Sequence, residues 1–198
     1  MATAPGRLFA RGRALDGAGS AALARLLEHP TFELLPLKTV GAQIEALPPA
    51  ARVSVTASPG RGIEATVELA ADRRARGFDA RPHLSARMVR DRTHLTDLLA
   101  RAAAADLQRV FVVGGDTERP GNYPDGLSLL RAIHEVGPVP AAIGVPCYPD
   151  GHPFIADEAL LSALRAKLPL AAWMTTQLCF DAARIRGWLE ERRAEGFE

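Results

Sequence analysis

An aspartate directly after a glycine pair stands where α/β folds place reactive groups. Asp116 follows Gly114-Gly115, and the apolar run at residues 110–113 precedes both glycines. An apolar run without alternation predicts a strand buried on both faces, as in a parallel sheet. Glycines let the backbone turn sharply or let a ligand approach closely. Because α/β folds carry their chemistry just beyond the carboxyl ends of such strands, Asp116 is predicted to be a site residue.

Glu33 is a second acid with chemical potential. It lies between Phe32 and Leu34 in an otherwise apolar predicted strand. Both faces of that strand are expected to be buried, so the carboxyl should be at least partly desolvated. Burial disfavours the charged form of an acid, and a protonated carboxyl suits a general acid. The alternative is a solvated acid at the edge of the sheet.

Polar side chains also lie at or just after the carboxyl ends of other predicted strands. They are Thr56, His83, Tyr148, His152 and Gln177. Each has an ordinary structural interpretation when taken alone: His83 could be a structural histidine, and Gln177 could bond to the backbone. The carboxyl ends of parallel strands share one edge, however, so the agreement of six strands favours a polar ligand site there. The sequence shows no catalytic triad order, no metal-ligand spacing and no phosphate-binding loop.

Strands and helices alternate along the sequence. Hydrophobic patterning predicts strands at residues 31–36, 52–56, 78–83, 110–113, 141–145 and 172–178. Helices are predicted from residue 16 or 20 to 29, at 63–76, 93–105, 127–136, 155–167 and 181–194, with one helical turn at 43–47. Thr93 and Asp181 are the expected N-caps of two helices, and Pro82 is expected near the end of the third strand.

Connections of this length predict parallel βα units. An open doubly wound sheet and a (β/α) barrel both satisfy the pattern. The first strand is not followed by GxGxxG, which argues against a dinucleotide-binding sheet. A complete eight-unit barrel needs about 250 residues, whereas this chain of 198 residues has six units.

Composition predicts one globular domain over residues 1–198. Hydrophobic residues make up 47% and charged residues 24%, values close to the globular average. The net charge of +1 gives no electrostatic reason to expect nucleic acid or a membrane surface as a partner. The N-terminal 17 residues lack an apolar signal core, so we expect a cytoplasmic protein. Cys147 and Cys179 lie in apolar contexts and are expected to be buried thiols.

Five short motifs, in order and at compatible spacing, resemble those of the methylenetetrahydrofolate reductase family. Residues 32–39 read FELLPLKT, similar to FEFFPPKT, and residues 82–85 read PHLS, similar to PHLTC. Residues 112–116 read VVGGD, similar to ALRGD; residues 147–153 read CYPDGHP, similar to GYPEGHP; and residues 175–181 read TTQLCFD, similar to ITQFFFD. The resemblance covers nearly the whole chain.

The resemblance implies a TIM-type (β/α)8 barrel that holds FAD at the strand carboxyl ends and reduces methylenetetrahydrofolate to methyltetrahydrofolate. NADH or NADPH would give a hydride to the flavin and leave before the folate binds. Glu33 would be the acid that opens the methylene bridge, Asp116 would lie near both flavin and pterin, and Gln177 would contact the folate. The implied flavin-binding residues are Thr56, His83, Gly115, Asp116, Tyr148, His152 and Lys167.

Several departures from the family motifs fall on the flavin side. Gly114 replaces an arginine, Ala57 replaces an aromatic residue, and Leu160 stands near the place of an acid. The folate-side residues Glu33, Asp116 and Gln177 remain. One hypothesis is therefore a family member with weakened FAD binding that passes a hydride directly from a nicotinamide to the folate.

The sequence also leaves the completeness of the barrel and the class of activity open. With six units, the first and sixth strands would be open edges that could pair with another chain. We expect a fragment of a longer barrel; a self-associating short barrel and a binding protein without catalysis are the alternatives. The leading activity is folate-linked oxidoreduction, followed by non-catalytic folate or flavin binding and by tetrahydrofolate-linked methyl transfer or demethylation.

Overall fold

The computed structural model describes residues 16–37 and 39–197. Lys38, part of the motif at residues 32–39, and residues 1–15, on which the cytoplasmic expectation rests, lie outside this range. The chain divides after Pro30 into two compact units. The first contributes one described helix, α1 (Gly17–Glu28), and the side chain of Asp16 caps it by accepting a hydrogen bond from the Gly19 amide at 2.7 Å.

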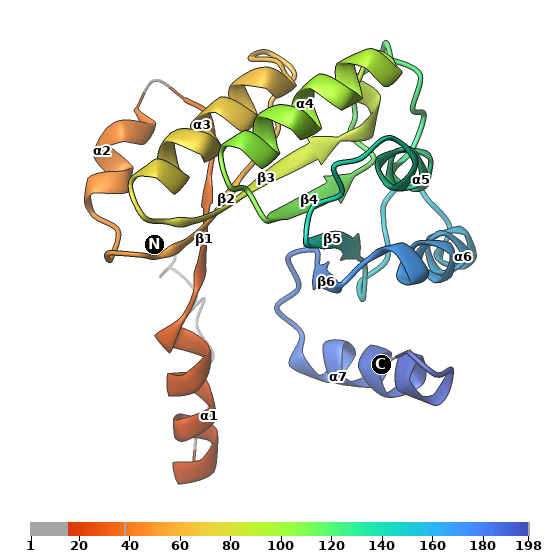
Figure 1. The fold of residues 1–198 in the computed structure, drawn as a ribbon. Coiled ribbons are helices and arrows are strands. Elements are labelled where there is room, and N and C mark those ends of the chain that lie inside the picture. The colour runs from red at the N-terminus through yellow and green to blue at the C-terminus, as the bar shows by residue number, and fades with distance from the viewer. Residues whose placement is uncertain (1–15, 38, 198) are drawn as a thin grey trace, which may run out of the picture. The chain divides into compact units, whose positions relative to one another are not determined.

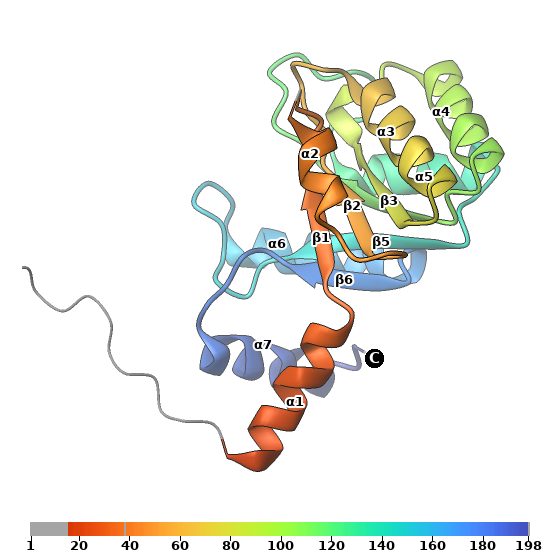
Figure 2. The same cartoon turned by 90° about the vertical axis from the view of Figure 1, so that its left-hand side faces the viewer.

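The second unit is built on a parallel sheet of six described strands in the order β1 to β6. The strands are β1 (Thr31–Leu34), β2 (Arg52–Val55), β3 (Asp79–Ser85), β4 (Arg109–Val113), β5 (Ala142–Cys147) and β6 (Trp173–Thr176). Figures 1 and 2 show the sheet curled like part of a barrel. Within the described residues β1 and β6 do not pair with each other, so the sheet is a TIM-like half-barrel.

Helices connect successive strands and cover the outer face of the sheet (Figure 2), and a last helix follows the sixth strand. They are α2 (Val40–Glu45), α3 (Ile63–Ala75), α4 (Arg92–Ala104), α5 (Gly126–Val136), α6 (Asp157–Lys167) and α7 (Ala182–Ala194). One-turn 3₁₀ helices at Ala86–Met88 and Leu168–Leu170 follow β3 and α6. This confirms the predicted βα alternation.

The core lies between the sheet and the helices. In β2 to β5, alternate strand residues face the helices and are buried, for example Val53, Val110 and Val145. The prediction that residues 110–113 are buried on both faces is therefore wrong. Val110 and Val112 are fully buried, but Phe111 and Val113 are only half-buried, because the inner face of an unclosed sheet has no second layer.

Several boundary predictions also need correction. The first strand ends at Leu34 rather than at residue 36, and the helical turn expected at residues 43–47 is α2, which begins at Val40. Asp91, not Thr93, caps α4, because its carboxylate accepts the His94 amide hydrogen bond at 2.8 Å. The third strand continues two residues past His83, with Pro82 as the last residue paired with β2. The sixth strand is shorter than expected and ends at Thr176. Asp181 caps α7 as predicted, bonding the Ala183 and Arg184 amides.

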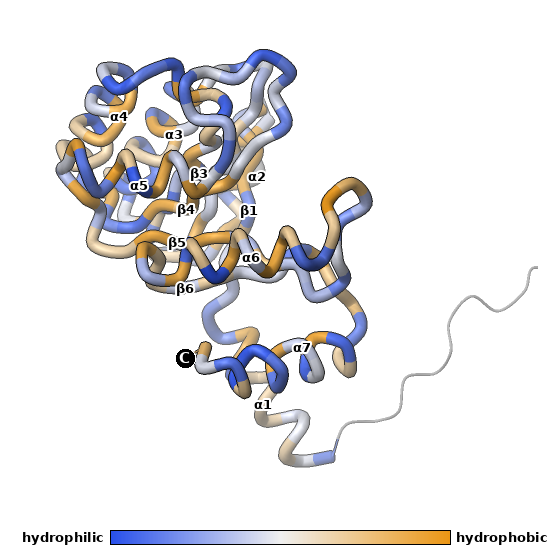
Figure 3. The backbone as a smooth tube through the Cα atoms, turned by 90° about the vertical axis from the view of Figure 1, so that its right-hand side faces the viewer, coloured by the Kyte–Doolittle hydropathy of each residue, from blue (hydrophilic) through white to orange (hydrophobic). Residues whose placement is uncertain are grey.

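Hydropathy follows this architecture, with hydrophobic strands inside and mostly hydrophilic loops at the strand ends (Figure 3). Within the described residues, no helix has the length and apolar character needed to cross a membrane.

Candidate functional site

The inner face of the half-barrel encloses a concavity of about 570 Å³. All six strands contribute alternate residues to its wall, and the loop after β6 adds more. Three predicted site residues, Glu33, His83 and Gln177, lie together in it. They come from β1, from β3 and from the position after β6, so the curled sheet brings together residues far apart in sequence.

Glu33 faces the concavity from β1, and a neighbouring hydroxyl holds its carboxylate. Thr56, one residue past β2, donates from Oγ1 to Glu33 Oε1 at 2.6 Å. Thr56 thus acts on the acid, although it does not line the concavity itself. The predicted desolvation of Glu33 is wrong, because its side chain is exposed. The physical reason is that β1 is an edge strand: within the described residues it pairs with β2 on one side and with no strand on the other.

His83 is a half-buried polar group of this site. Its Nε2 lies 2.6 Å from Ser54 Oγ on the adjacent strand, and its ring packs 5.0 Å from that of Phe111. Burial holds the pKa of His83 below its usual value, and the negative charge of Glu33 opposes this effect. The neutral imidazole is therefore favoured at neutral pH.

Ser54, Arg81 and Trp173 also line the concavity and were not predicted. The Arg81 guanidinium donates to Asp79 at 2.7 Å and lies 5.7 Å from the Trp173 ring centroid. Its buried Nε has no hydrogen-bond partner among the described residues. A signal was present in the sequence: residues 79–85 alternate polar and apolar, which predicts one polar inner face.

Gln177 continues the edge of β6. Its backbone amide donates to the Cys147 carbonyl at 2.8 Å, while its side chain is exposed beside Thr175 and Cys179 in the concavity. The prediction that both cysteines are buried holds only in part: Cys147 is buried, whereas Cys179 is half-buried. Burial raises the pKa of the Cys147 thiol to about 11, so the thiol is neutral.

Gly115 and Asp116 lie outside the concavity, in the segment after β4. Asp116 is exposed. Gly115 has a φ of +85°, and a Cβ there would collide with the Ser85 hydroxyl. Glycine is therefore needed at this position for backbone reasons alone, and Asp116 does not line the concavity with Glu33.

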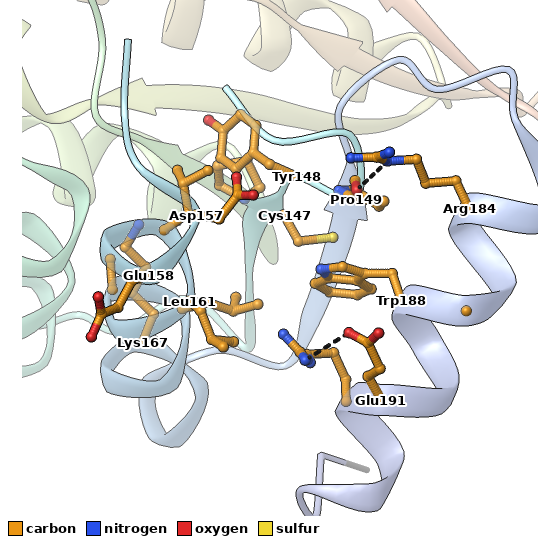
Figure 4. A pocket seen from close by; sticks show the side chains of 16 residues that line it. Cys147, Tyr148, Pro149, Asp157, Glu158, Leu161, Lys167, Arg184, Trp188 and Glu191 are labelled. Atoms are coloured by element: carbon orange, nitrogen blue, oxygen red, sulfur yellow. Dashed lines mark hydrogen bonds and ion pairs between the residues drawn. The ribbon is translucent and has the colours of Figure 1, made fainter. Parts of the chain in front are cut away.

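Tyr148 and Lys167 line a separate hollow of about 570 Å³ between α6 and α7 (Figure 4). Cys147, Leu161 and Trp188 form its apolar wall. Burial lowers the pKa of Lys167, and the negative charge of Asp125 opposes that shift. His152 lies next to this hollow, with its ring 5.5 Å from that of Tyr148 in a T-shaped arrangement.

The predicted flavin residues are divided between two adjoining hollows, since Pro146 lines both. His83 faces the concavity, and Thr56 bonds to Glu33 there. Tyr148 and Lys167 face the hollow between α6 and α7. Lys167 also lies near the segment after β4, because a Cβ at Gly126 would meet Lys167 Cε at 3.7 Å and the Gly114 amide nitrogen at 3.6 Å. FAD binding stays a prediction.

A metal site is also not formed by the described residues, since no three His, Cys, Asp or Glu side chains gather to hold an ion. No known protein-family model matches this chain. The site must therefore be interpreted from its own residues.

Proposed function

We propose that this protein reduces 5,10-methylenetetrahydrofolate to 5-methyltetrahydrofolate with NADH or NADPH, in the concavity of a (β/α) barrel of which the half-barrel is a part. One observation carries the proposal: Glu33, His83 and Gln177 line the same concavity. Its volume of about 570 Å³ falls in the range of small-molecule sites, about 300–1,000 Å³.

The wall of the concavity suits a pterin. A pterin has a flat ring with donors and acceptors along one edge, so it needs an aromatic surface and an amide-type partner. Phe111 and Trp173 offer ring faces, with their centroids 6.5 Å apart. The Gln177 carboxamide can both donate and accept hydrogen bonds, and it is exposed to a ligand in the concavity.

Glu33 supplies the proton that the reaction requires. In the proposed step the carboxyl protonates N10 of the folate, the bond between N10 and the methylene carbon breaks, and an N5 iminium forms. A hydride from C4 of the nicotinamide then adds to the methylene carbon, giving the methyl group and oxidised nicotinamide. Thr56 keeps the carboxyl in place through its 2.6 Å hydrogen bond.

The proposed hydride path runs directly from the nicotinamide to the folate. Support comes from the departures from the family motifs on the flavin side, at Gly114, Ala57 and Leu160. A nicotinamide ring and a pterin ring would share the concavity, where the neutral His83 and the Ser54 hydroxyl face them. Bound rings would also cover the Glu33 carboxyl and remove it from water.

The experiment is the oxidation of NADH and NADPH, followed with and without methylenetetrahydrofolate. We expect oxidation that depends on the folate. Glu33→Gln should lower its rate by at least about 100-fold, because proton donation by a positioned acid contributes about 10²–10⁴. Glu45→Gln, an exposed glutamate at the end of α2, is the matched control and should keep the rate. Folate-independent oxidation, or full activity in Glu33→Gln, would contradict the proposal.

Non-catalytic folate binding is the second candidate. The exposure of Glu33 and the position of Asp116 outside the concavity favour it. It predicts folate binding without any oxidation of the nicotinamide.

A further inference from the structure

A second hollow, of about 400 Å³, lies where the chain leaves the carboxyl ends of β2, β3 and β4. Three arginines line it: Arg87 after β3, and Arg90 and Arg119 from the loops that follow β3 and β4. Glu64 is the one acidic side chain that lines it within the described residues. Neither the concavity nor the proposed reaction uses this hollow.

The Glu64 carboxylate is already paired with basic side chains. Glu64 accepts a hydrogen bond from Arg90 at 2.9 Å, and its carboxylate lies 3.0 Å from Nε2 of the buried His94. Its own backbone amide, Arg90 and His94 hold the pKa of Glu64 below its usual value, against the effect of burial. Arg87 uses Nε to bind the Thr117 carbonyl at 2.8 Å, which leaves its terminal nitrogens available. Arg119 is exposed and makes no hydrogen bond or ion pair with the described residues.

A partnerless polar group in the same wall points to a ligand. Thr117 lines the hollow, and its buried Oγ1 has no hydrogen-bond partner among the described residues. Such a group is costly unless something binds it. The amino terminus of α3 also meets the hollow at Gly62 and Ile63, where the Glu64 carboxylate already bonds to its own backbone amide.

The loops around the hollow are held together rather than loose. The Gly121 amide donates to the Arg87 carbonyl at 3.0 Å, and the Asn122 amide donates to the Arg90 carbonyl at 2.9 Å. A Cβ at Gly121 would overlap the Val89 carbonyl, so this close approach requires glycine. These bonds hold the backbones of Arg87 and Arg90 against the loop that carries Arg119.

We propose that this arginine hollow binds the ribose 2′-phosphate of NADPH, and thereby selects NADPH over NADH. A phosphate monoester is a compact dianion, and the planar arginine fork matches its oxygens. The Thr117 hydroxyl would gain the partner that it lacks. β3 links the two sites, because His83 on β3 lines the concavity and Arg87, just after the end of β3, lines the arginine hollow. A dinucleotide with its nicotinamide in the concavity would reach the hollow along this strand. This inference rests on the proposed function for the identity of the nucleotide.

The test measures the binding of 2′,5′-ADP, of 5′-AMP and of inorganic phosphate by calorimetry, without folate or turnover. We expect 2′,5′-ADP to bind at least about tenfold more tightly than 5′-AMP, because the 2′-phosphate gains charge-assisted hydrogen bonds from the arginines. Phosphate should compete with 2′,5′-ADP. Arg119→Gln should remove most of the preference, and Thr117→Val should weaken 2′,5′-ADP alone. Arg131→Gln, an exposed arginine on α5, is the control of equal charge.

Equal binding of 2′,5′-ADP and 5′-AMP would overturn the assignment, as would an unchanged preference in Arg119→Gln. Thr117→Val separates binding from folding, because its hydroxyl bonds nothing in the described structure and its loss should not lower the stability. The result is independent of catalysis. A preference for 2′,5′-ADP without folate-dependent oxidation would retain the phosphate site and reject the proposed reaction. Folate-dependent oxidation that uses NADH and NADPH equally would retain the proposed reaction and reject the phosphate site.

Discussion

His83 and Glu33 show how the half-barrel treats two titratable groups on the same wall. Both face the concavity, but His83 lies between Ser54 and Phe111 on neighbouring strands, whereas Glu33 lies on the outermost strand and is exposed. Water therefore reaches the proposed acid and is largely kept from the imidazole. A ligand that fills the concavity would change the environment of Glu33 more than that of His83.

The lowered pKa of His83 predicts a dependence of stability on pH. The unfolded chain binds a proton at His83 below pH of about 6.5, while the folded protein binds it only at lower pH. The unfolded state thus carries more protons in this window, and the free energy of unfolding must fall as the pH drops from about 6.5 through the folded pKa.

Urea denaturation at several pH values measures this effect. His83→Gln should flatten the decline, while His134→Gln, at an exposed histidine on α5, should keep it. An identical pH profile in His83→Gln and the unmodified protein would show that burial does not control this histidine.

At the scale of elements, a glycine sets the contact between β5 and β6. Gly144 pairs with Trp173 on the next strand, and the indole lies where a Cβ of residue 144 would be. Trp173 can therefore lie flat over β5 and close the wall of the concavity. Any side chain at residue 144 must displace the indole.

Gly144→Ala should lower the free energy of unfolding by about 1–3 kcal/mol, the usual cost of overpacking. Gly187→Ala in α7 is the matched control, because a Cβ there meets nothing within 4 Å and alanine favours a helix by up to about 1 kcal/mol. Denaturant unfolding of both variants decides the point. A Gly144→Ala protein as stable as Gly187→Ala would mean that the indole does not depend on this glycine.

Sequence patterns predicted most of these elements, because apolar periodicity and caps such as Asp181 are local. The patterns failed where the burial of a side chain depended on the position of its strand within the sheet. Glu33 looked buried between Phe32 and Leu34, but its exposure follows from β1 having no neighbour on one side in the described residues. Phe111 likewise looked like a core residue and instead faces a concavity.

The sequence also predicted part of the candidate site. Glu33, His83 and Gln177 could be placed together, since parallel strands put their carboxyl ends on one edge. The loops after the strands could not be placed in this way. Asp116 and Lys167 therefore lie apart from the concavity, and the arginines around Thr117 were not recognised as a group.

For the whole molecule, the curled sheet arranges the possible functions around the carboxyl ends of its strands. The concavity offers the acid and the aromatic rings, and the arginine hollow lies beyond the ends of β2, β3 and β4. Homo-oligomerisation through the edges of β1 or β6, and the closure of a full barrel, stay predictions. The account of the whole molecule depends on a nicotinamide and a folate meeting in one concavity without a flavin between them.

Isotope transfer tests that claim most directly. The protein, purified without added flavin, is given methylenetetrahydrofolate and NADPH carrying deuterium at C4 of the nicotinamide on the transferred face, and the product is examined by mass spectrometry. Direct transfer predicts one deuterium in the methyl group of every 5-methyltetrahydrofolate formed. Methyl groups without deuterium, or no 5-methyltetrahydrofolate at all, would contradict the account.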